Sequence, residues 1–128
     1  MTRVLLLTSF LAASAALAGD TQPPFEVATE HRISVVVPHT FAREDAVTRL
    51  GYLLSYWHER FHMRVDWFDG EAFITGSIFG LKVKARFTVT DGEVVAIASD
   101  PGWLWRGRAE SYVTKKVQKY MHPTYQEP

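Results

Sequence analysis

The chain has 128 residues, with 14 lysine and arginine residues balanced by 14 aspartate and glutamate residues, and it has no cysteine. The balanced charge argues against an electrostatically driven nucleic-acid binder, and the abundance of aromatic and β-branched residues argues against a disordered chain. Without cysteine there is no disulfide, thiolate nucleophile or iron–sulfur cluster, so any metal site needs histidine and carboxylate ligands.

Residues 1–18 have the features of a secretory signal peptide. Arg3 supplies a positive charge, residues 4–17 are almost all apolar or small, and residues 16–18 form an Ala-Leu-Ala cleavage pattern. The apolar run is shorter than the roughly 20 residues that span a bilayer, which favours cleavage over anchoring. We therefore expect an exported protein, periplasmic or secreted and not transmembrane after cleavage. A translation start further downstream would instead make it cytoplasmic.

A leader at residues 19–26 is expected to precede one domain at residues 27–122. Alternating apolar residues predict a first strand from Val27 to Pro38, which cannot donate a ladder hydrogen bond. Thr40 is the predicted N-cap of a helix of about 20 residues, which extends to about His62. Its apolar stripe comprises Ala46, Val47, Leu50, Leu53, Leu54, Trp57 and Phe61.

Four strands are predicted next, at residues 64–68, 71–79, 81–90 and 93–99. Asp-Gly turns at residues 69–70 and 91–92 join neighbouring strands, and Asp100-Pro101-Gly102 closes the sheet. A second helix at residues 109–121 ends before Pro123, and residues 123–128 form a polar tail. The predicted fold is α+β: an antiparallel sheet with the order strand–helix–four strands–helix, and with the helices packed on one face.

His58, Glu59 and His62 form an H-E-x-x-H sequence, in which two histidines bind zinc and the glutamate acts as base in zinc-dependent hydrolases. The motif lies on the last predicted turn of the first helix, where histidine is commonly a surface residue near the negative end of the dipole. A zinc site also needs a third ligand. No spacing selects one among Asp66, Asp69, Glu71 and His122, so we favour the surface interpretation and predict no cofactor.

Basic residues lie on one strand and on the last helix. They could attract anionic lipid or a polyanion, but with zero net charge we favour solvated polar faces. These residues are Lys82, Lys84 and Arg86 on the strand, and Arg106, Arg108, Lys115, Lys116 and Lys119 on the helix.

Trp103 and Trp105 are the candidate residues for binding a ligand or surface. They could bind lipid or polymer at the surface, or they could fill the gap between sheet and helix in the core. We favour the second interpretation, the core plug, for at least one of them. The sheet and last helix could also enclose an apolar pocket, although the same side chains could simply fill the core. The predicted lining is Trp67, Phe73, Phe87, Ile97 and Tyr112.

Several segments together resemble the polyhydroxyalkanoic acid system proteins, which are short bacterial proteins. The matching segments are residues 46–50, 59–61, 65–67, 69–70 and 76–78 and the last helix, so that the resemblance spans residues 27–121. It implies a link to polyhydroxyalkanoate and transfers no catalytic residue. We therefore expect a non-catalytic accessory protein that engages an apolar or interfacial partner. The alternatives are the zinc hydrolase and a structural subunit of an envelope assembly.

Overall fold

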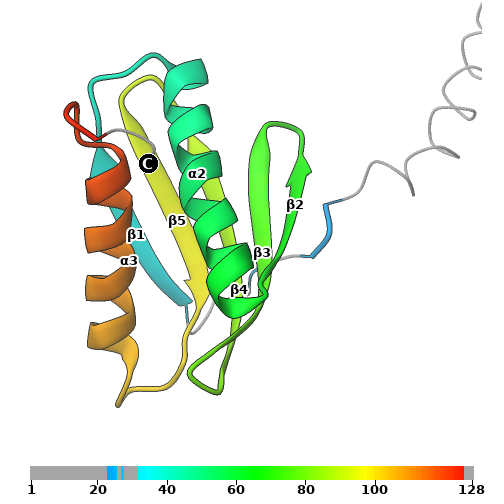
Figure 1. Cartoon of the computed structure of the whole chain (residues 1–128). Coiled ribbons are helices and arrows are strands. Elements are labelled where there is room, and N and C mark those ends of the chain that lie inside the picture. Colours follow the sequence, from blue (N-terminus) through cyan, green and yellow to red (C-terminus); the bar gives the residue numbers. More distant parts are fainter. Residues whose placement is uncertain (1–22, 26, 28–31, 126–128) are drawn as a thin grey trace, which may run out of the picture.

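The computed structural model describes residues 23–25, 27 and 32–125. Its elements are β1 (Arg32–Pro38), α2 (Arg43–Phe61), β2 (Arg64–Phe68), β3 (Glu71–Ile78), β4 (Leu81–Val89), β5 (Glu93–Ser99) and α3 (Arg106–Tyr120). The strands form one antiparallel sheet in the order β1-β5-β4-β3-β2, and both helices cover the same face of it (Figure 1). The predicted α+β fold is therefore confirmed. The predicted signal peptide lies outside the described residues.

Alternation along the strands places apolar side chains on the face that the helices cover. In β1, Ile33 and Val35 are buried, whereas Val36, which follows them, points to the other face and is exposed. The predicted stripe of α2 packs against this side of the sheet. Its buried members are Ala46, Leu50, Leu53, Leu54 and Trp57, with Val47 and Phe61 partly buried.

The start of α2 differs from the prediction, because Thr40 is not its N-cap. The helix begins after Ala42, which provides no side-chain hydrogen bond. A carboxylate from the β4–β5 turn takes this role, since Asp91 Oδ1 accepts a hydrogen bond of 2.8 Å from the backbone N–H of Arg43. The cap is thus supplied by a residue far away in the sequence, which local pattern analysis does not detect.

The other boundaries shift by a few residues. The strand predicted from Val27 is described from Arg32 to Pro38, and residues 28–31 lie outside the described residues. β3 ends at Ile78, so that Phe79 belongs to the turn rather than the strand. α3 spans Arg106–Tyr120, and therefore begins and ends earlier than predicted.

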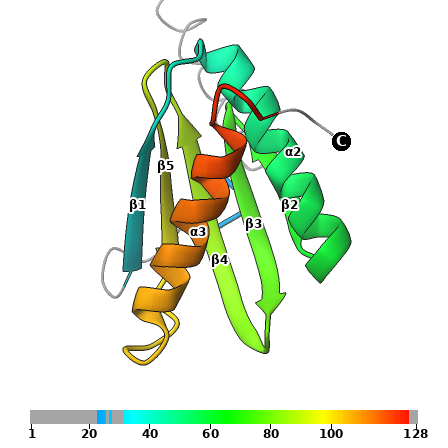
Figure 2. The ribbon, with the colours of Figure 1, turned by 60° about the vertical axis from the view of Figure 1, so that its left-hand side comes forward.

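The two helices are held together at one end and diverge toward the other (Figure 2). Near the start of α2, Arg49 Nη1 donates hydrogen bonds of 3.1 Å to the carbonyls of Tyr120 and His122 at the end of α3. The guanidinium also lies 4.0 Å from the ring centroid of Phe41. Because these carbonyls carry the negative end of the helix dipole, a cation is favourable there.

The opposite face of the sheet carries the predicted basic residues Lys82, Lys84 and Arg86, which alternate with the helix-facing positions of β4. Phe73 also lies on this face, where its ring packs edge-on against Phe25 at 5.4 Å. In the described part of the chain, no helix is both long and apolar enough to cross a membrane.

Candidate functional site

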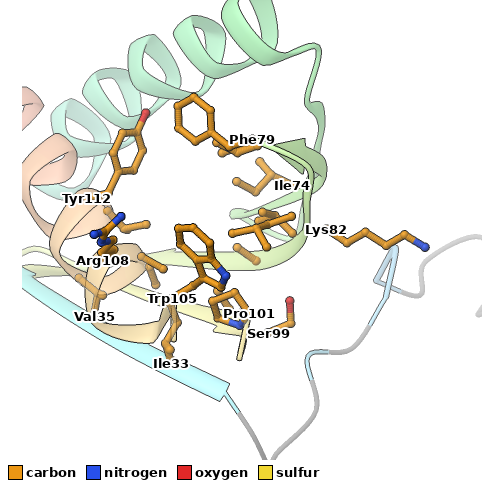
Figure 3. A pocket seen from close by; sticks show the side chains of 18 of the residues that line it. Ile33, Val35, Ile74, Phe79, Lys82, Ser99, Pro101, Trp105, Arg108 and Tyr112 are labelled. Atoms are coloured by element: carbon orange, nitrogen blue, oxygen red, sulfur yellow. The ribbon is translucent and has the colours of Figure 1, made fainter. Parts of the chain in front are cut away.

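A cavity of about 340 Å³ lies between the first half of α3 and the sheet, at the end where the helices diverge (Figure 3). Its volume falls in the usual range of small-molecule sites, about 300–1,000 Å³. Nearly all of its lining is apolar. The residues come from β1 (Ile33, Val35), α2 (Trp57), β3 and its turn (Ile74, Ile78, Phe79), β4 (Leu81, Lys82, Val83, Ala85), β5 and the following loop (Ala96, Ala98, Ser99, Pro101, Trp105) and α3 (Arg108, Ala109, Tyr112, Val113).

Small side chains in the middle of the sheet create the space. Ala85 of β4 pairs with Ala98 of β5, and Ala96 of β5 lies two residues before Ala98 on the same face. All three alanines face the helices and line the cavity. Leucine or phenylalanine at these positions would reach α3, whereas the methyl groups of alanine leave a gap. Side chains of α2 do not fill this gap, because α3 begins far from α2 and only Trp57 of α2 reaches the cavity.

Trp57 and Tyr112 form the cavity wall where the two helices still touch. Trp57 Nε1 donates a hydrogen bond of 3.0 Å to the hydroxyl oxygen of Tyr112, and the two rings stack at 6.2 Å. Trp57 is almost completely buried, so its N–H needs this partner. The wall therefore presents paired polar groups and a largely aromatic surface to any ligand.

Of the five residues considered as the lining of a pocket, only Tyr112 lines the cavity. Phe87 packs against Trp57 in the filled core, with ring centroids 5.9 Å apart. Phe73 lies on the other face of the sheet, and so does Ile97, which pairs with Arg86. Trp67 is exposed on the edge strand β2. Small side chains, rather than the large ones of the predicted lining, create this space.

Four large apolar side chains in the two loops that contribute Phe79 and Trp105 to the cavity lining are exposed, and we call them the apolar rim. The exposed fractions are 81% for Phe79, 79% for Trp103, 67% for Leu104 and 43% for Trp105. Phe79 lies in the β3–β4 turn and the other three in the β5–α3 loop, at the same end of the molecule (Figure 1). Phe79 and Trp105 line the opening itself (Figure 3). Trp103 is therefore not a core residue, whereas Trp105 is the least exposed of the four and lines the space between the sheet and α3.

Phe79 adopts a backbone conformation that is unfavourable for a bulky residue. Its φ is +52° and that of Gly80 is +81°, as in the two-residue turns that favour Asn-Gly. The Phe79 ring packs edge-on against Phe61 at 5.6 Å, yet most of its surface is exposed. Strained and exposed apolar residues are characteristic of binding sites. Sequence analysis missed Phe79 because it continued the apolar pattern of the strand.

Asp100 fixes the loop that carries the two tryptophans. Its Oδ1 accepts a hydrogen bond of 2.8 Å from the backbone N–H of Gly102, and its Oδ2 accepts one of 2.8 Å from Arg106 Nε. The hydrogen bond to Asp100, together with the negative charge of this carboxylate, raises the pKa of Arg106 above its usual value. Arg106 is thus engaged in holding the loop, which carries Trp103 and places Trp105 in the cavity lining.

The H-E-x-x-H sequence does not form the helical pair of histidines that was predicted. α2 ends at Phe61, and His62 follows it in a left-handed conformation with φ of +58°. His58 remains on the helix, where its Nδ1 is 2.7 Å from the carbonyl oxygen of Met63 and so acts as the donor. A zinc-binding H-E-x-x-H motif requires both imidazoles on one face of the same helix, and His62 does not meet this requirement.

Of the four side chains considered as a third ligand, Asp66 lines a surface hollow together with His58 and His62, and the other three do not line it. Asp66 pairs with Arg64 on β2 at 2.9 Å, and Asp69 lies in the β2–β3 turn. Glu71 accepts a hydrogen bond from Thr88, and His122 contacts Thr124 beyond α3. Among the residues that the structure describes, no three histidine, aspartate or glutamate side chains gather as a possible metal site.

Comparison with known proteins gives no relative. No family model matches the chain, and neither a curated protein nor a solved structure matches it. The cavity and the apolar rim are therefore the observations from which function is inferred.

Proposed function

We propose that this protein is a non-catalytic binding protein that holds an apolar ligand in the cavity and engages an apolar surface with its rim. The observation that carries this proposal is that two exposed residues of the apolar rim, Phe79 and Trp105, line a cavity that is itself apolar. Ligand sites are typically concave, largely apolar and bordered by a few polar groups. Here Arg108 and the paired Tyr112 hydroxyl provide such groups.

The rim supports an interfacial role because exposing large apolar side chains in water is unfavourable. Burying such a side chain lowers the free energy by about 1.5–3 kcal/mol. Contact of Phe79, Trp103 or Leu104 with lipid or polymer would therefore be favourable. Tryptophan is also well suited to the boundary between water and an apolar phase. A ligand leaving such a phase would meet the cavity opening directly.

We further propose that the protein is exported and that its partner is an apolar polymer or a lipid surface, as for a polyhydroxyalkanoic acid system protein. The features of residues 1–18 support export, and the order of elements supports the resemblance. On this proposal the mature domain hydrolyses neither esters nor peptides.

Partition experiments with tryptophan variants test the proposal. We expect the double variant Trp103→Ala/Trp105→Ala to bind phosphatidylcholine vesicles and polyhydroxybutyrate beads less than the unmodified protein does. Trp67→Ala is the matched control, because Trp67 is exposed at 45% but lies on β2. The control should partition normally. Unchanged partition of the double variant, accompanied by a large loss of thermal stability, would assign both tryptophans a purely structural role.

A further inference from the structure

Arg108 is the charged side chain at the cavity opening. It is exposed, it lines the cavity on the α3 side next to Tyr112, and its Cζ lies 5.7 Å from the ring centroid of Trp105 (Figure 3). Within the described part of the chain Arg108 has no ion pair, unlike Arg106, which is bound to Asp100. Its positive charge is therefore available to a ligand.

The two acidic residues nearest to Arg108 in the sequence of this region do not line the cavity. Asp100 is bound to Arg106, and Glu110 follows Arg108 on α3. The first turn of α3 contains no acidic residue, and its N-cap, Trp105, provides no side-chain hydrogen bond, so the positive end of the helix dipole lies at the opening. The residues that line the cavity include no aspartate or glutamate. Lys82 contributes to the lining, but its ammonium group points away from the cavity (Figure 3). Arg108 is thus the group placed to meet an anion.

The cavity interior selects against polar ligands. Its walls are mostly aliphatic and aromatic. The Trp57 N–H is already bonded to Tyr112, and the Ser99 hydroxyl oxygen accepts a hydrogen bond of 3.3 Å from the backbone N–H of Lys84. Peptide N–H and C=O groups, or sugar hydroxyls, would lose their water without gaining partners there, at a cost of about 1–3 kcal/mol for each group. A hydrocarbon chain pays no such cost. The chemistry of the site therefore combines an apolar interior with one cation at the opening.

We propose that the cavity binds a single-chain carboxylate amphiphile, a fatty acid or related acyl chain, with the chain inside and the carboxylate against Arg108. This inference rests on the proposed function and specifies its ligand class. A fork of guanidinium N–H groups matches a carboxylate in geometry as well as charge. The guanidinium and the Trp105 ring lie next to each other in the cavity lining, where the head group of a bound chain would emerge.

The test compares decanoate with 1-decanol, which has the same chain length and no charge, by displacement of a fluorescent apolar probe at neutral pH and low salt. We expect decanoate to bind about fivefold more tightly than decanol, as for a partly exposed ion pair. Arg108→Gln should remove this preference and leave the affinity for decanol unchanged. Lys115→Gln removes an equal charge from an exposed position further along α3 and should keep the preference.

The outcomes separate this inference from the proposed function. Equal binding of decanoate and decanol by the unmodified protein, or an unchanged preference in Arg108→Gln, would overturn the role of Arg108 and leave an apolar-ligand protein. A loss of the preference in Lys115→Gln as well would show a general charge effect and overturn the assignment. If neither the probe, decanol nor decanoate binds, the proposed function fails together with the inference.

Discussion

Replacing Ala98 with leucine tests whether the space between α3 and the sheet is a true cavity. Ala98 lies on β5, faces the helices and lines the cavity beside its register partner Ala85. Leucine adds about three methylene equivalents, each worth about 0.8 kcal/mol when buried. After about 0.5–1 kcal/mol for lost rotamer freedom, a side chain that fits the cavity should raise the free energy of unfolding by about 1–2 kcal/mol.

Ala72→Leu is the matched control. Ala72 lies on the same face of the sheet, is 0% exposed and does not line the cavity. Leucine at this position overpacks a filled core, which typically costs about 1–3 kcal/mol. The two substitutions are therefore expected to change stability in opposite directions although they add the same atoms.

Urea denaturation followed by tryptophan fluorescence measures the free energy of unfolding of both variants. Their melting temperatures should differ by several degrees, since 1 kcal/mol corresponds to about 4–8 °C in a domain of this size. Ala98→Leu should also weaken decanol binding, because leucine fills the space that the chain needs. If Ala98→Leu destabilises the protein as much as Ala72→Leu does, no cavity exists at this site and the ligand proposal loses its basis.

Three further substitutions test contacts that the structure reveals. Asp91→Ala removes the carboxylate that caps α2, and urea denaturation should show a loss of about 1 kcal/mol. Arg49→Met leaves the last carbonyls of α3 without their donor, and thermal unfolding should show a loss of about 1–2 kcal/mol. Phe79→Asn introduces a residue that tolerates positive φ, so stability should be kept or rise by up to about 1 kcal/mol while partition to vesicles falls. A strong loss of stability in Phe79→Asn would instead make this ring a structural element.

Two controls accompany the capping variants. Glu93→Ala changes an exposed carboxylate in the strand that follows the Asp91 turn, and Arg60→Met removes an exposed cation from the other end of α2. Both should change stability by less than about 0.5 kcal/mol. Equal effects of control and test substitutions would show that net charge, rather than the individual hydrogen bonds, determines the losses.

Periodic patterns in the sequence were sufficient for the order of the elements and for the buried faces of β1, α2 and β4. Alternation placed Ile33 and Val35 toward the helices, and helical spacing identified the stripe of α2 that contains Leu50 and Trp57. Asp-Gly pairs located two of the turns. These features are local: each depends on residues a few positions apart, whose side chains must share one buried face whatever the rest of the chain does.

The tertiary structure alone decided the site. The cavity exists because alanines of β4 and β5 come into register beneath a helix that diverges from α2, and no local pattern contains that register or that divergence. The helix cap at Arg43 came from Asp91, and exposure of Trp103 depended on where the loop emerges relative to α3. Local periodicity tells which side of an element is buried. The amount of space left between buried faces depends on how side chains from distant segments meet, and this is settled only when the elements pack.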